Sequence, residues 1–122
     1  MARFRLARPA QIDLANILAT SADRWGHEGR QRYAALLAAA MRQVAAEPGG
    51  PLTRKRPELR CGGVRSFHVR NAHRSESARV RRPVHVLYYR VAEKDVIEII
   101  RVLHERMDAS RHLDELQTED DS

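Results

Sequence analysis

Two amphipathic segments occupy the first half of the chain and predict two helices. The first begins near Pro9, a residue suited to a first helical turn, and ends at Gly26, which tolerates a left-handed conformation. One face of this helix carries its apolar stripe: Leu14, Ile17, Leu18, Ser21 and Trp25. The second helix covers residues 28–46 and has the clearest helical periodicity: Tyr33, Leu36, Leu37, Ala40, Met41 and Val44. Because so short a turn joins them, we expect an antiparallel helix hairpin.

Strand patterns lie on both sides of the helices. They fall at residues 4–7, 64–70, 84–91 and 95–103. The first predicts a short edge strand, and the last is apolar on both faces, which is typical of a central strand. Short connections favour an antiparallel meander for the last three strands. Residues 52–63 look irregular and basic, and residues 71–83 form a polar, arginine-rich loop. The order β-α-α-β-β-β predicts an α+β fold, with the helix hairpin on a small antiparallel sheet.

Charge is distributed unevenly along the 122 residues, a length that suits one domain. Bases outnumber acids by 22 to 16, for a net charge of +6. Residues 54–82 hold ten bases and only two acids, whereas residues 114–122 hold five acids and no base. We therefore expect one domain over residues 1–113, followed by an acidic, disordered tail at residues 114–122. The basic segment indicates either a surface that attracts phosphate polyanions or a solubilising surface in an arginine-biased genome.

Composition also narrows the class of protein. Cys61 stands alone, which excludes a disulfide framework and a zinc site built from cysteines. The apolar runs are too short to cross a bilayer, and the N-terminus leads into no secretory core, so we expect a cytoplasmic protein without membrane contact. Neither a phosphate-binding glycine loop nor a metal cluster at a standard spacing occurs. We therefore expect no metal and no cofactor.

Several short motifs, in their order and spacing, resemble the ParE branch of the RelE/ParE toxin superfamily. They comprise the helix hairpin with Trp25-Gly26, GVRSF at 63–67, VLYYRV at 86–91, IEIIRVLHERMD at 97–108 and RHL at 111–113. The resemblance extends over roughly residues 3–113. One departure stands out: the basic loop at residues 71–83 is longer than the usual turn between those strands. Its extra arginines extend a nucleic-acid contact or belong to a neutral insertion: Arg74, Arg79, Arg81 and Arg82.

The resemblance implies the toxin half of a type II toxin–antitoxin system. ParE-like toxins inhibit DNA gyrase and hence replication, which arrests growth and can stabilise a plasmid or chromosome. A cognate antitoxin, usually a ribbon-helix-helix (ParD-like) protein, neutralises them, so operator DNA is reached only through the antitoxin. We expect a protein inhibitor of gyrase rather than an enzyme. Two alternatives remain: a ribosome-dependent mRNA endonuclease like RelE, or an inactive partner and co-repressor of the antitoxin.

Candidate residues follow from the resemblance and from side-chain chemistry. The expected target-contacting residues are Arg65, Arg101, His104, Arg106, Asp108 and Arg111. Asp108 has a structural alternative as a helix cap or ion-pair partner, and the arginines near it share that alternative. An endonuclease would use cations and a proton shuttle drawn from Arg65, Arg90, Arg101, His68, His85 and His104, of which Arg65, Arg101 and His104 are the principal candidates. With only two lysines, the chain lacks the lysine-rich set of RelE-type enzymes.

An antitoxin would bind beside the helix hairpin. The candidates for an apolar groove there are Trp25, Tyr33, Leu37 and Met41. Core packing is the more frequent role for most residues of this kind. An acidic antitoxin segment would complement the basic body of the chain.

Overall fold

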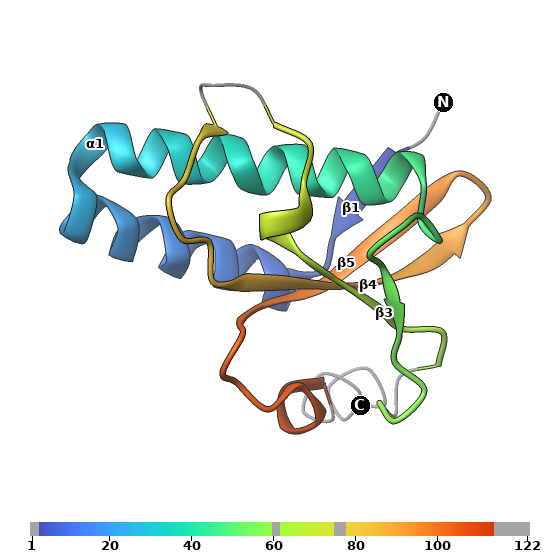
Figure 1. Cartoon of the computed structure of the whole chain (residues 1–122). Coiled ribbons are helices and arrows are strands. Elements are labelled where there is room, and N and C mark those ends of the chain that lie inside the picture. The colour runs from blue at the N-terminus through green and yellow to red at the C-terminus, as the bar shows by residue number, and fades with distance from the viewer. Residues whose placement is uncertain (1–2, 60–61, 75–77, 114–122) are drawn as a thin grey trace.

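The computed structural model describes residues 3–59, 62–74 and 78–113, and it has an α+β fold. Its elements are β1 (Arg3–Leu6), α1 (Arg8–Ala46), β2 (Arg54–Lys55), β3 (Arg65–His68), the 3₁₀ turn η1 (Val69–Asn71), β4 (His85–Glu93) and β5 (Val96–His104). Residues 109–113 are helical. The helical layer covers one face of the sheet (Figure 1), as the sequence predicts. The predicted acidic tail at residues 114–122 lies outside the described residues.

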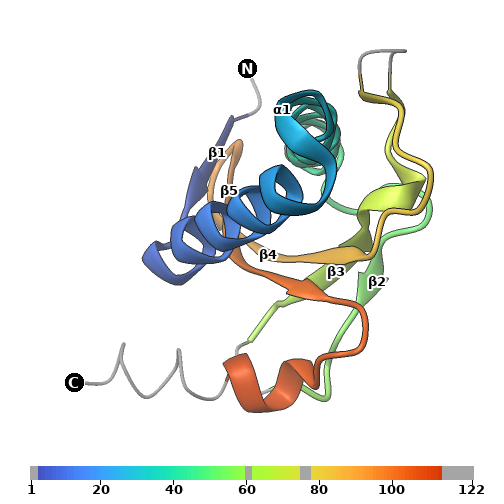
Figure 2. The ribbon, with the colours of Figure 1, turned by 90° about the vertical axis from the view of Figure 1, so that its left-hand side faces the viewer.

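The helix hairpin forms within α1, which is interrupted at Gly26. This residue has φ 74° and ψ −173°, a conformation that is essentially restricted to glycine. The two helical parts on either side of Gly26 run back alongside each other (Figure 2), which confirms the predicted hairpin. A second glycine is needed close by, because a Cβ atom at Gly29 would collide with the Cβ of Trp25. The helix ends at Ala46, where Pro48 and Gly49 follow.

The sheet has the order β1-β5-β4-β3-β2. Strands β3, β4 and β5 form the predicted antiparallel meander, and β1 is an edge strand as expected. Strand β1 pairs with β5 in parallel, from Arg3 opposite Val96 to Leu6 opposite Ile99, so the sheet is mixed rather than wholly antiparallel. Parallel pairing is accessible here because the long α1 hairpin and the later strands lie between the two partners in sequence.

Two local predictions were wrong. Within the supposedly irregular residues 52–63, β2 pairs with β3, placing Arg54 opposite Ser66. Two charged residues give no hydrophobic alternation, so only the backbone pairing reveals this strand. Strand β3 ends at His68 instead of continuing to residue 70. The His68 ring accepts a hydrogen bond from the Arg70 amide at 3.1 Å, and this contact accompanies the turn into η1.

The sheet buries apolar residues on both faces. The cluster under the helix hairpin includes Leu36, Leu37, Phe67, Leu87, Tyr89 and Ile99. A smaller cluster on the opposite face joins the strands to the helical residues 109–113 and to two residues near β2 and β3: Leu59, Val64, Tyr88, Ile100, Leu103, Ala109 and Leu113. Strand β5 contributes to both clusters, which explains why its sequence is apolar on both faces and confirms its central position.

Candidate functional site

An ion pair fixes the end of β5 to the first helical turns. The Arg101 guanidinium donates from Nε to Asp13 Oδ2 at 2.8 Å and from Nη2 to Oδ1 at 2.9 Å. Asp13 also accepts a hydrogen bond from the Val102 amide at 3.0 Å, and Arg101 Nη1 donates to the His112 carbonyl at 3.3 Å. Both charged side chains are largely buried, at 15% and 13% exposed. Arg101, predicted to contact the target, therefore connects α1, β5 and the segment after β5.

A histidine pair lies where β4 begins and β5 ends. His85 stands opposite His104 in the strand register, and their rings meet edge to face with centroids 5.8 Å apart. The Tyr33 hydroxyl accepts a hydrogen bond from the Val84 amide at 3.2 Å, so its own hydrogen is available to His85 Nδ1, 2.5 Å away. Burial, and then the neighbouring His104 and His68, lower the pKa of His85 to about 4. His85 is therefore neutral at physiological pH.

A second polar contact lies near this pair, between His68 of β3 and Glu105. Nε2 of His68 is 2.7 Å from Oε2 of Glu105. A carboxylate only accepts hydrogen bonds, so this nitrogen carries the proton, while Nδ1 accepts from the Arg70 amide. The hydrogen bond from His68 lowers the pKa of the Glu105 carboxyl. The contact joins the end of β3 to the turn after β5.

The turn after β5 carries exposed side chains beside these fixed ones. Arg106, Met107 and Arg111 are exposed. Asp108 precedes the helical residues 109–113 and accepts from the Ser110 amide at 3.1 Å and from the Ser110 hydroxyl at 2.7 Å. These bonds lower the pKa of the Asp108 carboxyl. Asp108 is thus a helix N-cap, the structural role that the sequence left open.

Arg65 lies at the other side of the sheet, next to β2, and is held by internal contacts. Its Nη2 donates to the Thr53 hydroxyl at 2.8 Å, and β3 pairing sets it opposite Tyr89. Its Nε is buried and has no hydrogen-bond partner among the described residues. The six expected target-contacting residues are therefore divided: Arg101 and Arg65 are anchored inside the fold, whereas His104, Arg106, Asp108 and Arg111 follow one another along one rim.

The four candidates for antitoxin contact are also divided. Trp25 is 71% exposed at the turn of the helix hairpin. Tyr33, Leu37 and Met41 are buried in the core beneath the hairpin, in the more frequent of the two roles that the sequence allowed. Trp25 ends the apolar stripe of the first helical part, whereas the other three lie on the stripe of the second, and only Trp25, next to the turn at Gly26, is exposed.

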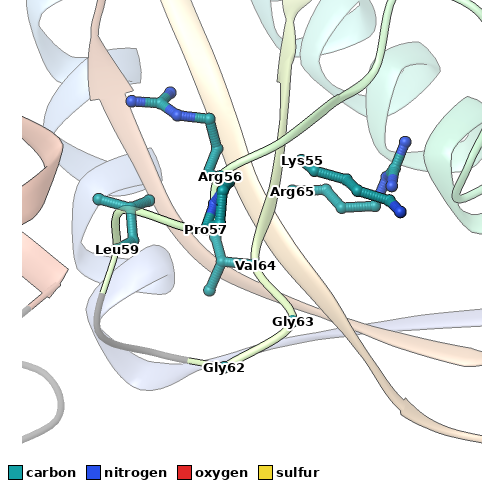
Figure 3. A pocket seen from close by; sticks show the side chains of 8 residues that line it. All are labelled: Lys55, Arg56, Pro57, Leu59, Gly62, Gly63, Val64 and Arg65. Atoms are coloured by element: carbon teal, nitrogen blue, oxygen red, sulfur yellow. The ribbon is translucent and has the colours of Figure 1, made fainter.

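A hollow of about 250 Å³ lies beside β2. It is lined by Lys55, Arg56, Pro57, Leu59, Gly62, Gly63, Val64 and Arg65. Lys55 and Arg65 extend side by side, and Arg56 points the other way (Figure 3). Arg56 forms an ion pair with Glu58, with 2.8 Å between Nε and Oε2, and its guanidinium group lies over the Tyr88 ring. The described residues of this lining are cations and apolar groups, with no acid or imidazole among them.

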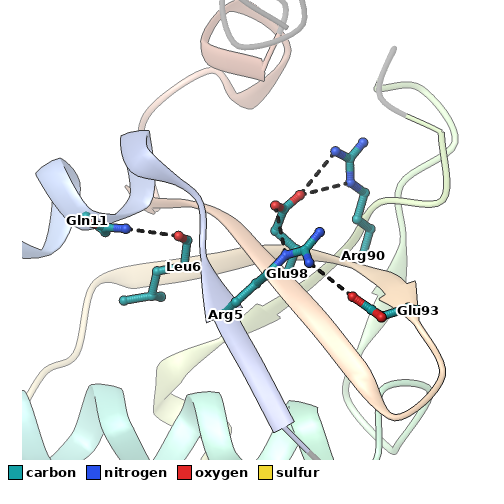
Figure 4. A network of polar contacts seen from close by, with 6 residues as sticks. All are labelled: Arg5, Leu6, Gln11, Arg90, Glu93 and Glu98. Carbon is teal, nitrogen blue, oxygen red and sulfur yellow. Dashed lines mark hydrogen bonds and ion pairs between the residues drawn. The ribbon is translucent and has the colours of Figure 1, made fainter.

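The remaining arginine proposed for catalysis, Arg90, belongs to a surface ion-pair network. Glu98 of β5 accepts from Arg90 of β4 at 3.1 Å and from Arg5 of β1 at 3.4 Å, and Arg5 also reaches Glu93 at 3.2 Å (Figure 4). The network crosses three neighbouring strands and neutralises both arginines. The sequence analysis missed Glu98 and Asp13, the two acids that occupy predicted functional arginines. Their only signal was an acid within an apolar stretch.

Among the described residues, no three His, Cys, Asp or Glu side chains gather closely enough to hold a metal ion. Among the same residues, no helix combines the length and apolar character needed to cross a membrane.

Known proteins match nearly the whole chain. The family model described as "ParE toxin of type II toxin-antitoxin system, parDE" matches residues 4–109. The protein called Toxin ParE1 of Caulobacter vibrioides is 37% identical over 113 residues, which cover 93% of this chain and 99% of that protein. A protein of the same name from Mycobacterium tuberculosis is 34% identical over 111 residues, covering 91% of this chain and 97% of the relative.

Proposed function

This chain belongs to the ParE toxin family of type II toxin–antitoxin systems, and from that membership we propose that it arrests growth by inhibiting DNA gyrase. The observation that carries the proposal is the family match over residues 4–109, which includes the helix hairpin and all of the sheet except Arg3. Gyrase acts inside the cell, so the proposal includes a cytoplasmic location. Inhibition by binding requires no catalytic group of the toxin.

The rim after β5 is the proposed gyrase contact. Arg106 and Arg111 are exposed cations there, and Met107 adds an exposed apolar side chain. Arginine combined with an apolar neighbour is a frequent composition of energetically important interface positions. The rim is preorganised, because the Asp108 cap and the Arg101–Asp13 ion pair hold its two ends. Preorganisation lowers the entropy lost on binding.

A type II toxin has a cognate antitoxin, and for this chain we expect a ParD-like, ribbon-helix-helix protein. The exposed Trp25 is a suitable anchor for it, since tryptophan is enriched among residues that dominate binding energy. An acidic segment of the antitoxin would be attracted by a chain whose net charge is +6.

The test is a DNA cleavage assay with purified gyrase, supercoiled plasmid and ATP. A gyrase poison yields linear plasmid that appears only after the gyrase is denatured, and added antitoxin abolishes it. Unchanged plasmid topology, from a folded protein that still stops growth, would overturn the proposal and direct attention to translation. Growth that continues on expression would instead identify an inactive partner of the antitoxin.

A pair of variants locates the contact. Arg106→Ala/Arg111→Ala removes two exposed cations from the rim, and we expect at least a tenfold higher toxin concentration for the same cleavage. Arg30→Ala/Arg32→Ala removes two exposed cations from α1 and is the matched control. Equal loss in both variants would indicate a general charge effect rather than a contact at the rim.

The endonuclease alternative finds no support in the arrangement of its candidate residues. Arg101 is neutralised by Asp13, Arg90 by Glu98, and Arg65 donates to Thr53. These cations have internal partners on different parts of the sheet, so they are not poised together around a reacting phosphate. We therefore do not propose a second function.

A further inference from the structure

Two groups of basic residues in this protein differ in their partners. Three arginines on the strands β1, β4 and β5 form internal ion pairs: Arg5 with Glu93 and Glu98, Arg90 with Glu98, and Arg101 with Asp13. Such pairs serve the fold and leave little charge for a partner.

The second group lies between residues 54 and 82. Its exposed members are Arg54, Lys55, Arg70, Arg74, Arg79, Arg81 and Arg82, which we call the basic strip. Within the described part of the chain, no carboxylate forms an ion pair with five of them: Arg54, Lys55, Arg70, Arg81 and Arg82. Glu58, the described acid of this segment, is already paired with Arg56.

The backbone segments that carry the strip lie on one side of the molecule. β2, η1 and the segment 78–84 follow one another along the same side of the molecule, on the right of Figure 2 and toward the viewer in Figure 1. β2 is the last strand of the sheet, so its outer side is not covered by another strand. The fold thus gathers exposed cations on one side, with Glu58 as the one described acid among them.

We propose that the basic strip binds the phosphate backbone of duplex DNA. Exposed cations that bind phosphates gain free energy by releasing the counterions condensed on the duplex. The guanidinium group suits this role because its planar donors match two phosphate oxygens at once. The contact needs no base recognition, so the binding is independent of DNA sequence.

The distribution of aromatic residues favours a duplex over a single strand. Proteins bind single-stranded RNA or DNA largely by stacking bases on exposed aromatic rings. All six aromatic residues of this chain are described, and only Trp25, on the helix hairpin, is largely exposed. The strip therefore has cations without a stacking platform.

The same composition argues against a protein as its main partner. Energetically important positions in protein interfaces are enriched in tryptophan, tyrosine and arginine, packed in apolar surroundings. Between Arg54 and Arg82, no described large apolar residue is among those largely exposed to solvent. Leu52, two positions before the strip, is 63% exposed, so the surface is dominated by cations rather than made of them alone, and such a surface fits a polyanion.

The test measures fluorescence anisotropy of a labelled duplex of random sequence at several salt concentrations, without gyrase. The variant Arg54→Gln/Lys55→Gln/Arg81→Gln/Arg82→Gln neutralises four exposed members of the strip. The matched control, Arg8→Gln/Arg24→Gln/Arg30→Gln/Arg32→Gln, removes the same charge from exposed positions of α1. Thermal unfolding establishes that both proteins are folded. If the quadruple strip variant does not fold, the two double variants Arg54→Gln/Lys55→Gln and Arg81→Gln/Arg82→Gln replace it.

We expect the strip variant to lose at least tenfold in affinity at low salt, and the control to change by less than threefold. The slope of log affinity against log salt should fall by about 2 to 4 in the strip variant, since each lost phosphate contact removes about 0.9. Equal losses in the two variants would overturn the proposal, as would tighter binding of a single strand than of the duplex.

The outcome is separate from that of the gyrase proposal. If the protein poisons gyrase but does not bind bare duplex DNA, only the proposal that the basic strip binds DNA is wrong. A protein that binds duplex without affecting gyrase contradicts only the gyrase contact. If the strip variant loses affinity for the antitoxin but keeps its affinity for DNA, the strip is a protein interface and the proposal is wrong.

Discussion

Arg101 and Asp13 lie 88 positions apart in sequence and form a two-point ion pair with N···O distances of 2.8 and 2.9 Å. The same carboxylate accepts the Val102 amide, so Asp13 holds both the side chain and the backbone at this point of β5. It thereby attaches the first helix to the strand that leads into the proposed gyrase contact. Arg101 therefore stabilises the fold, and it affects target binding only by positioning the rim.

Replacing Asp13 should therefore lower the stability of the folded protein. Asp13→Asn removes the carboxylate that forms the two-point ion pair with the largely buried Arg101, and we expect a loss of about 2–4 kcal/mol in the free energy of unfolding. Urea denaturation measures the loss. Asp23→Asn, an exposed carboxylate of the same helix, is the matched control and should change stability by less than about 0.5 kcal/mol. A similar effect of both variants would mean that the ion pair contributes little.

His85 should make the protein sensitive to acid. The pKa of His85 in the folded protein is about 4, below its ordinary value of 6.5. Between these two pH values the unfolded chain is protonated at His85, whereas the folded chain is not. Its contribution is fully present above about pH 6.5 and is lost as the pH falls toward 4. Allowing for solvent contact, we expect a loss of about 1–2 kcal/mol between pH 7.5 and pH 5.

The His85→Gln variant isolates this contribution. Glutamine does not titrate, so the variant should lose less stability than the parent protein over the same pH interval, whatever its stability at pH 7.5. His73→Gln, at an exposed position, is the matched control. Parallel curves for the parent and His85→Gln would show that His85 is not the group responsible.

The helix hairpin was predictable because its causes are local. The stripe at Tyr33, Leu36 and Leu37 has a helical period, and Gly26 marks the point where the chain must adopt a positive φ. Strand β5 was equally clear, since residues that face two cores are apolar at nearly every position. Strand β2 was not, because its two charged residues carry no pattern and depend on backbone pairing with β3.

The site was harder to predict because it depends on contacts between distant residues. No local sequence pattern predicts that Arg101 pairs with Asp13, or that the Tyr33 hydroxyl hydrogen-bonds to His85, which is 52 positions away. Sequence identified the arginines as candidates but not which of them the fold would neutralise. Helical periodicity likewise could not separate the exposed Trp25 from the buried Leu37, because both lie on apolar stripes and the difference arises from where the hairpin turns.

Replacing either glycine of the hairpin turn, Gly26 or Gly29, should lower the stability of the protein. Gly26→Ala places a side chain at φ 74°, and Gly29→Ala drives its Cβ into that of Trp25, so we expect each to cost about 1–3 kcal/mol of stability. Gly49→Ala is the control, because a Cβ there meets no atom within 4 Å and its φ is not positive. Thermal unfolding compares the three variants. Unchanged stability in Gly29→Ala would mean that the turn at Trp25 adjusts without strain.

Trp25 should matter for the antitoxin and hardly at all for folding. Its side chain is 71% exposed, so Trp25→Ala removes little buried area, and we expect stability to change by less than about 1 kcal/mol. Binding of the cognate antitoxin should weaken at least tenfold, which corresponds to about 1.4 kcal/mol. Calorimetric titration measures this affinity. Ile12→Ala, at an exposed apolar position near the start of α1, is the control. An antitoxin that binds Trp25→Ala as tightly as the parent protein must dock elsewhere on the toxin.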